Sequence, residues 1–228
     1  MAIALLALGV ILALAFLPQM WVRSVIKRHS RERSDFPGTG GELARHLLDG
    51  MGLQTVKVEE TTLGDHYDPM TKTVRLLPDH YGGRSLSAVV IAAHEVGHAM
   101  QDATGYGPLG ARTRLARQAQ RIEVFGAVVM LAAPVLMVLV KAPMMMLIQL
   151  LAGLLILSFS ILIHVVTLPV EFDASFRRAL PVLKAGGFIP DSDMAAARQI
   201  LTAAAFTYVA AAALSLLDVM RWLRVLRI

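Results

Sequence analysis

Four long stretches without a charged residue limit what this chain can fold into more than any other feature. They comprise residues 2–22, 124–140, 142–170 and 199–217. Two are long enough for the roughly 20 residues of a membrane-spanning helix, and two lie near the minimum of about 17. Hydrophobic residues make up 56% of the chain, against roughly 45–50% in soluble domains. The sequence therefore predicts a mostly α-helical membrane protein with about four transmembrane or membrane-embedded helices and a small α+β catalytic domain.

Basic residues gather directly after the first apolar stretch, at Arg23, Lys27, Arg28, Arg31 and Arg33. The positive-inside rule predicts from them an outside N-terminus and a cytoplasmic segment from 23 to 123. The net charge of +5 also raises the possibility of nucleic-acid binding, but no nucleic-acid motif accompanies these residues. We therefore expect a lipid bilayer with anionic headgroups as a partner, and no nucleic acid.

One short motif, His94-Glu95-Val96-Gly97-His98, carries the chemistry. Positions i and i+4 of a helix share one face, so two imidazoles one turn apart can hold one Zn²⁺. The glutamate between them is the type of residue that serves as general base in this arrangement. The chain has no cysteine, so any metal must be held by His and carboxylate groups. The motif predicts a zinc hydrolase with Glu95 as its base.

Two histidines leave a catalytic zinc site short of one protein ligand. The candidates are Glu171, His164 and Glu123, and spacing alone cannot choose among them. Glu171 is favoured because it follows the third apolar stretch at the predicted membrane edge, on the same side as the motif. A second donor to the oxyanion is usual in this chemistry, and Tyr208 or Arg178 could supply it.

The segment between the first two apolar stretches shows both helical and strand patterns. Thr39 and Glu42 form a capping-box pattern before a helix that ends near Gly52. Alternating apolar residues predict strands at 54–60, 64–68 and 72–77, and a helix that begins at Ser85 or Ser87 follows. The domains expected are an anchor (1–22), a soluble catalytic domain (23–123), a transmembrane hairpin (124–168), a helix with the third ligand (169–190) and a C-terminal membrane-associated helix (191–228).

The motif at 94–98, the run Glu171-Phe-Asp-Ala174 and the strand-turn-strand at 64–75 together resemble the YugP-type neutral zinc metallopeptidases of bacterial membranes, and more distantly the HtpX-type membrane peptidases. The resemblance implies a zincin-like domain, Glu171 as third ligand and a multi-pass location in the bacterial cytoplasmic (inner) membrane with the site at the cytoplasmic face. In the distant group an aspartate four residues after this ligand orients a zinc-bound histidine. Here that position is Ser175, and Asp173 is the candidate for that task.

The resemblance also implies that an edge strand beside the motif helix pairs with an extended substrate. That strand is expected at 71–77 and includes Thr71, Lys72, Thr73, Val74 and Arg75. The function expected is a membrane-integrated endopeptidase that acts on membrane-associated or unfolded protein or peptide substrates. Two alternatives stay open: a zinc-retaining membrane scaffold or pseudoprotease that binds other membrane proteins, and a zinc hydrolase of a non-peptide amide. The sequence does not specify the oligomeric state.

Overall fold

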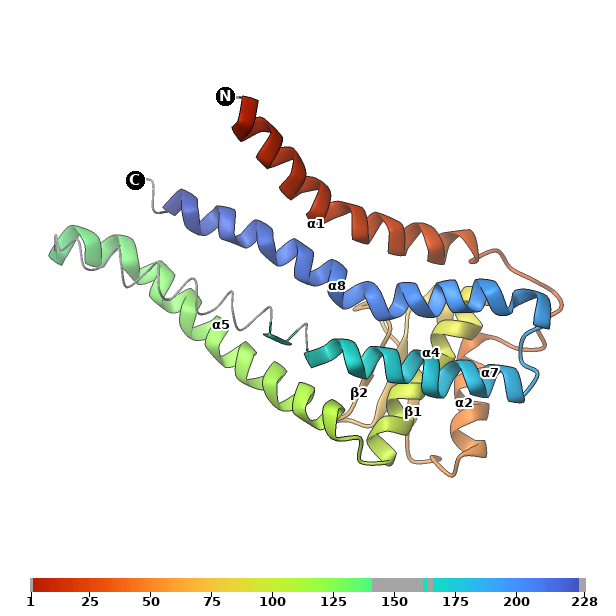
Figure 1. The fold of residues 1–228 in the computed structure, drawn as a ribbon. Coiled ribbons are helices and arrows are strands. Elements are labelled where there is room, and N and C mark those ends of the chain that lie inside the picture. The colour runs from red at the N-terminus through yellow and green to blue at the C-terminus, as the bar shows by residue number, and fades with distance from the viewer. Residues whose placement is uncertain (1, 141–161, 164–165, 226–228) are drawn as a thin grey trace. The chain divides into compact units, whose positions relative to one another are not determined.

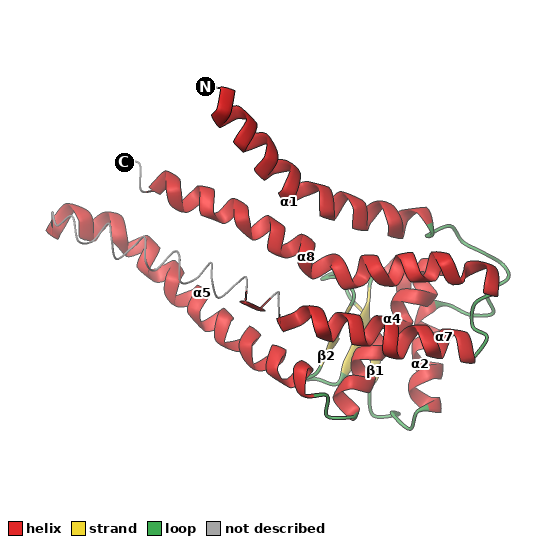
Figure 2. Ribbon diagram, in the orientation of Figure 1, coloured by secondary structure: helices red, strands yellow, loops and turns green. Residues whose placement is uncertain are grey.

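The computed structural model describes residues 2–140, 162–163 and 166–225, and the chain divides into two compact units. One unit comprises Met20–Gly110 and Leu168–Thr207, and the other comprises Met1–Gln19, Ala111–Thr167 and Tyr208–Ile228. The elements, drawn in Figures 1 and 2, are α1 (Ala2–Arg28), α2 (Gly40–Gly50), β1 (Lys57–Glu60), β2 (His66–Asp68), β3 (Thr73–Leu76), α3 (Pro78–Tyr81), α4 (Leu86–Ala103), α5 (Gly107–Val140), the π-helix η1 (Asp173–Ala179), α7 (Leu180–Ala185), the 3₁₀ turn η2 (Asp191–Asp193) and α8 (Met194–Val225).

The motif helix α4 forms the centre of the unit that contains Met20–Gly110. Every residue from Leu86 to Ala99 is buried, as expected for a helix that is apolar on all sides. Its first turn is capped by Ser85, whose Oγ accepts a hydrogen bond of 3.1 Å from the backbone N–H of Ala88. Helices α2, α3 and α7, the π-helix η1 and strands β2 and β3 all contact α4. The residues of the motif are therefore held rigidly on several sides.

The helix predicted from the capping box is confirmed as α2. Thr39 Oγ1 accepts from the Glu42 N–H at 3.2 Å, and the Glu42 carboxylate accepts from the Thr39 N–H at 2.7 Å. The three predicted strands are also present, each shorter than the sequence pattern suggested. Strand ends are the least determined part of such a pattern, because they depend on pairing partners that the sequence does not reveal.

The small sheet has the order β1-β3-β2, with β1 parallel and β2 antiparallel to β3. Val74 of β3 pairs with Val58 on one side and with Tyr67 on the other. The expectation that 71–77 forms the edge strand is therefore wrong, because both sides of β3 are already used in pairing. Thr71 and Lys72 belong to the turn before it. Strand β2 lies at an edge of the sheet and contacts α4.

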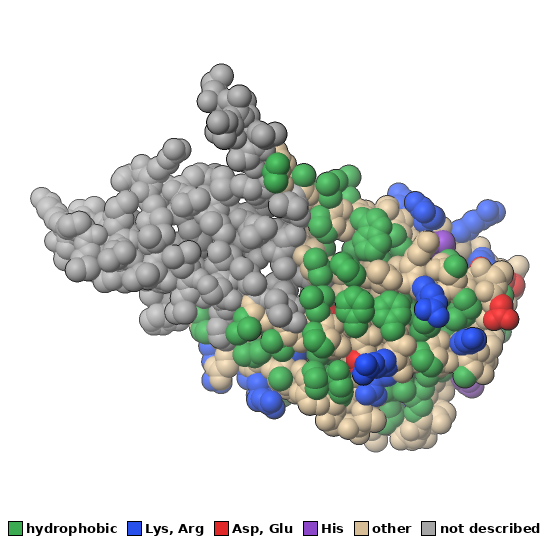
Figure 3. Space-filling model, in the orientation of Figure 1, with side chains coloured by type: hydrophobic (Ala, Val, Ile, Leu, Met, Phe, Trp, Pro, Cys, Tyr) green, Lys and Arg blue, Asp and Glu red, His purple; other side chains and the backbone are tan. Residues whose placement is uncertain are grey.

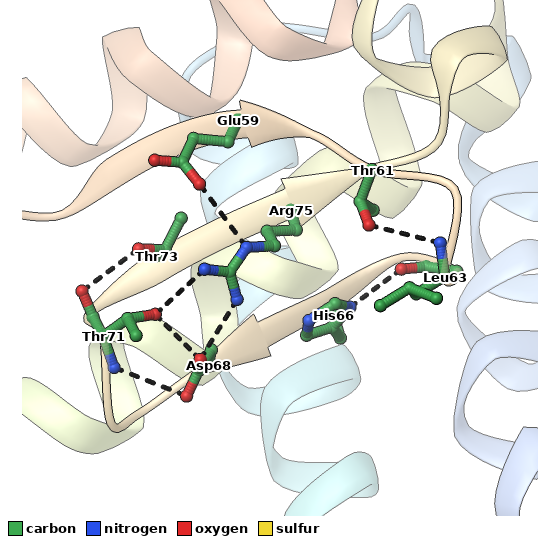
Figure 4. Close-up of polar contacts among 9 residues, drawn as sticks. Glu59, Thr61, Leu63, His66, Asp68, Thr71, Thr73 and Arg75 are labelled. Carbon is green, nitrogen blue, oxygen red and sulfur yellow. Dashed lines mark hydrogen bonds and ion pairs between the residues drawn. The ribbon is translucent and has the colours of Figure 1, made fainter.

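Arg75 ties the three strands together instead of facing a substrate (Figure 4). Its Nε lies 3.4 Å from Glu59 Oε2 on β1, and its Nη1 lies 3.0 Å from Asp68 Oδ2 on β2. Its Nη2 donates to Thr71 Oγ1 at 3.2 Å. Asp68 also accepts from the N–H of Met70 at 2.8 Å, which closes the turn. These contacts give Arg75 a structural role in the sheet.

The expectation of about four membrane-spanning helices is wrong for the part of the chain that the structure describes. No helix there combines the length and the apolar character that crossing a bilayer requires. For residues 199–217, which are rich in alanine, absence of charge is a weaker condition than strong apolarity. Most of 142–170 lies outside the described residues. The remaining domain boundaries stay a prediction.

Candidate metal centre

Three predicted ligands, His94, His98 and Glu171, meet in the interior of the unit that contains α4. Nε2 of His94 and Nε2 of His98 lie 3.2 Å and 3.3 Å from Glu171 Oε2. Their candidate ligand atoms all lie within 4.8 Å of one another, and the three residues are at most 4% exposed. Two imidazole nitrogens and one carboxylate oxygen are the donor set of a catalytic zinc site. The structure brings Glu171 to the histidine pair, and its role as a zinc ligand stays a prediction.

A close crossing of α4 and η1 brings Glu171 to the two histidines. At the crossing, Gly97 lies between the histidines and faces the backbone of Ala174, three residues after Glu171. A Cβ atom at Gly97 would lie 2.7 Å from the Ala174 carbonyl oxygen, which is closer than packed atoms approach. The glycine of the motif is therefore required by packing.

Gly97→Ala is expected to destabilise the fold although alanine is the better helix former. The overpacked contact costs about 1–3 kcal/mol, which outweighs the gain of about 1 kcal/mol in helix propensity. Gly50→Ala is the matched control, because Gly50 ends α2 and a Cβ atom added there would have nothing within 4 Å. Urea unfolding should show a lower midpoint for Gly97→Ala and an unchanged or higher one for Gly50→Ala. Equal stability of the two variants would contradict this account of the crossing.

The orientation of His94 is set by Ser175. The Ser175 hydroxyl lies 3.2 Å from the carbonyl oxygen of Leu201 and 3.0 Å from His94 Nδ1. A hydroxyl has one proton to donate, and the carbonyl can only accept. Ser175 therefore donates to Leu201 and accepts from the Nδ1–H of His94, which leaves the lone pair of His94 Nε2 toward Glu171. The residue at the position of the expected aspartate thus contacts a histidine after all, as a neutral acceptor.

The orientation of His98 is set by Gln101, one turn later on α4. The Gln101 amide nitrogen donates to the Val170 carbonyl at 2.7 Å and to Asp173 Oδ2 at 2.9 Å. Since both of these partners only accept, the amide oxygen must face His98 Nδ1, which lies at 2.9 Å. His98 Nδ1 therefore carries the proton, and its Nε2 also presents a lone pair to Glu171.

Asp173 holds the Gln101 side chain in the orientation that contacts His98. Burial raises the pKa of the Asp173 carboxyl group, but hydrogen bonds from Arg178, at 2.8 Å, and from Gln101 lower it by a larger amount. Its pKa therefore lies below the usual range. Arg178 in turn lies over the ring of Tyr106, 5.6 Å from its centroid. The chain of contacts from Arg178 to His98 holds the imidazole in one tautomer, as outer-shell partners of metal ligands do.

The resulting arrangement requires a cation. Two Nε2 lone pairs face a carboxylate oxygen at 3.2 Å and 3.3 Å, while both Nδ1 protons are committed elsewhere. Burial raises the pKa of Glu171, but His98 and His94, when protonated, hold it well below its usual range. Glu171 is thus ionised whenever positive charge shares the site. Electron pairs that converge in a buried site repel one another unless a proton or a metal ion lies between them. The residues present fit a zinc ion.

Replacing Gln101 with leucine is expected to weaken zinc binding by about 10- to 100-fold, as loss of an outer-shell partner usually does. The side chain is fully buried and leucine has a similar size, so the fold should persist. Gln199→Leu, at an exposed position of α8, is the matched control. Competition with a zinc chelator gives the affinity, and circular dichroism reports the fold. If Gln101→Leu bound zinc as tightly as the control, Gln101 would have no role in orienting His98.

The other predicted site residues divide into two groups. Glu95 is buried on α4 between the two histidines, and Arg178 donates to Asp173. The side chains of Tyr208 and Glu123, and all of His164, lie outside the described part of the structure. The roles of Tyr208 and Arg178 as oxyanion donors stay predictions. Gln101 escaped the sequence analysis, although its place three residues after His98 put it within reach of that imidazole.

Comparisons with known proteins agree with this centre. A family model described as "Putative neutral zinc metallopeptidase" matches residues 4–227. A protein of Bacillus subtilis (strain 168), named "Putative membrane protease YugP", is 39% identical over 218 residues, which cover 94% of this chain and 92% of the relative. No solved structure gives a significant match.

Proposed function

Because the chain belongs to the neutral zinc metallopeptidase family, we propose that it is an endopeptidase whose zinc ion is held by His94, His98 and Glu171. One observation carries the proposal: two imidazole lone pairs and one carboxylate converge in a buried site, with both Nδ1 protons engaged by Ser175 and Gln101. When bound, zinc acts as a Lewis acid that acidifies water and polarises the scissile carbonyl group.

Glu95 is the proposed general base. Its carboxylate accepts a proton from the attacking water and later donates it to the nitrogen of the departing amine. Ser175 and Gln101 keep the two imidazoles in the tautomer that leaves Nε2 unprotonated throughout. Arg178 and Asp173 hold Gln101 in place from the other side. The chain thus supplies one residue that moves a proton and four that fix the geometry around it.

We propose β2 as the strand that pairs with the substrate. It is an outer strand of the sheet and contacts α4, whereas the other outer strand, β1, contacts α2 and α3. An extended peptide can add to such an edge through backbone hydrogen bonds. Only unfolded or locally extended chains offer the backbone in this form. The proposed substrates are therefore unfolded or membrane-associated proteins.

We further propose that the protein is associated with the bacterial cytoplasmic (inner) membrane, with its site at the cytoplasmic face. The Bacillus subtilis relative is named a membrane protease, which supports association. Arg23, Lys27 and Arg28 are exposed at the end of α1, where anionic headgroups would attract them. Fractionation of bacterial cells tests the association directly.

Purified protein provides the test of the proposed activity. We expect about one zinc ion per chain by elemental analysis and cleavage of a peptide library at internal bonds. A chelator should stop the cleavage, and added zinc should restore it. Zinc without cleavage of any peptide would support a scaffold instead, and cleavage that survives complete removal of zinc would contradict the proposed chemistry.

A further inference from the structure

Four aromatic side chains form a continuous patch on the surface beside the metal centre. Trp21 of α1 lies 6.2 Å from Phe206 of α8, between ring centroids, and Phe206 lies 5.9 Å from Phe172. Phe172 lies 5.7 Å from Phe176 of η1. Trp21 is 43% and Phe172 40% exposed. In Figure 3 hydrophobic side chains form a band across the face shown. We call Trp21, Phe172, Phe176 and Phe206 the aromatic patch.

Exposed basic residues lie beyond the aromatic patch on each element that forms it. They are Arg23, Lys27 and Arg28 on α1, Arg177 and Lys184 on η1 and α7, and Arg198 on α8. On α1 and η1 the aromatic residues come first along the chain, and on α8 the basic residue comes first. Because α8 runs opposite to the other two (Figure 1), the basic residues lie beyond the aromatic ones in the same direction on all three elements, directly next to them at Arg177 and further away at Lys27 and Arg198. Several Lys and Arg side chains lie to the right of the hydrophobic band in Figure 3.

The spacing of the two zones matches the layers of a membrane surface. At a rise of 1.5 Å per residue, Lys27 lies about 9 Å beyond Trp21, and Arg198 about 12 Å beyond Phe206. The headgroup layer of one leaflet is roughly 5–8 Å thick. Aromatic rings at the edge of the hydrocarbon would therefore place the basic groups level with the phosphates or just outside them. This is the order in which interfacial aromatic residues and Lys or Arg occur in membrane proteins.

We propose that the aromatic patch and its basic border dock onto the surface of an anionic bilayer. The proposal rests on the membrane association proposed above and names the surface responsible. Trp and Phe side chains insert at the boundary between headgroups and hydrocarbon, and the Lys and Arg residues attract anionic lipid. A protein partner for the same surface would not account for the separation of aromatic from basic residues along three elements.

This docking also selects the substrate. Phe172 of the patch directly follows Glu171, which is buried at the metal centre, so one turn of helix contributes to both the docked surface and the centre. A peptide bond that reaches the site must then come from chain close to the lipid headgroups. The class of substrate that fits is a membrane-anchored protein cut in an extended segment next to its anchor.

Tryptophan fluorescence of the full chain provides the test. The protein has two tryptophans, so Trp222→Phe leaves Trp21 as the only reporter. The variant is added to vesicles of phosphatidylglycerol and phosphatidylethanolamine that carry a quencher near the headgroups. We expect strong quenching of Trp21. Leu63→Trp in a Trp21→Phe, Trp222→Phe background is the matched control, because Leu63 is 88% exposed and lies in the loop between β1 and β2, outside the elements that form the patch. Its fluorescence should be unaffected by the lipid quencher.

The outcomes distinguish the proposed docking surface from the proposed membrane association on which it rests. If the protein does not float with the vesicles at all, the proposed membrane association is overturned. If it floats but Trp21 is not quenched by lipid, the assignment of the surface is overturned while the association stands. Trp21 shielded from both the lipid quencher and aqueous acrylamide would show that protein covers the patch, and this too overturns the assignment.

The basic border has its own test. Arg177→Gln and Lys184→Gln should each lower the affinity for the anionic vesicles by about fivefold, the effect of one basic residue near such a surface. Vesicles of phosphatidylcholine alone should bind the native chain more weakly and show no difference among these variants. Affinities that are equal for both lipids would overturn the electrostatic part of the proposal.

Discussion

Replacing Glu95 with glutamine is expected to remove peptide hydrolysis while zinc stays bound. The amide has the shape of the carboxylate but cannot accept the proton of the attacking water, and general-base catalysis is worth about 10²- to 10⁴-fold. The turnover number should fall by that factor, because the interaction lost is one made in the transition state. Peptide cleavage and zinc content, measured on the same preparation, report the two properties separately.

Glu60→Gln is the matched control for this variant. Glu60 is exposed at the end of β1, so the same chemical change occurs there without touching the site. Its turnover and zinc content should equal those of the native chain. If Glu95→Gln kept more than about a tenth of the native turnover, Glu95 would not be the base, and another group would have to take the proton.

Replacing Glu171 with glutamine is expected to remove zinc and activity together. Loss of an outer-shell partner costs about 10- to 100-fold in metal affinity, so loss of a direct charged ligand should cost more than about 100-fold. Zinc binding also stabilises the fold, by about 2.7 kcal/mol at a concentration 100 times the Kd. Thermal unfolding with and without added zinc should therefore show a large shift for the native chain and little or none for Glu171→Gln.

Glu95→Gln and Glu171→Gln each serve as the control for the other. Glu95→Gln should keep the full zinc-dependent rise in unfolding temperature, and Glu171→Gln should lose it. His94→Ala should behave as Glu171→Gln does. A zinc-dependent rise in Glu171→Gln equal to that of the native chain would show that the carboxylate is no ligand, despite its 3.2 Å approach to His94.

The structural features that the sequence predicts correctly are those set by the spacing of residues within one helix. The i,i+4 separation of His94 and His98 and the capping box of Thr39 and Glu42 depend on one helix each, and both appear as predicted. Pairing of strands is not local: the family resemblance implies that β3 lies at the edge of the sheet, and it lies in the centre between β1 and β2. The order of strands depends on contacts with α2, α3 and α4 that no pattern within a strand records.

The contacts that orient the two histidines are predicted only in part: the sequence points to Asp173, which reaches His98 through Gln101, but not to Gln101 or Ser175 themselves. Ser175 and Asp173 lie two residues apart on the π-helix, yet Ser175 contacts His94 and Asp173 contacts Gln101. A regular α-helix places such neighbours on different faces, and π-helical turns commonly occur at functional sites for which sequence gives no clear signal. The prediction of membrane-spanning helices is wrong for the described residues, since no helix among them is both long and apolar enough to cross a bilayer.

The metal centre itself is most directly tested by anomalous X-ray diffraction at the zinc edge from crystals of the zinc-loaded full chain. The account predicts a single strong peak in contact with Nε2 of His94, Nε2 of His98 and a carboxylate oxygen of Glu171. Another histidine beside a carboxylate among the described residues is His80, whose Nδ1 lies 2.8 Å from Asp65 Oδ2. A zinc peak at that pair, or none beside Glu171, would contradict the account.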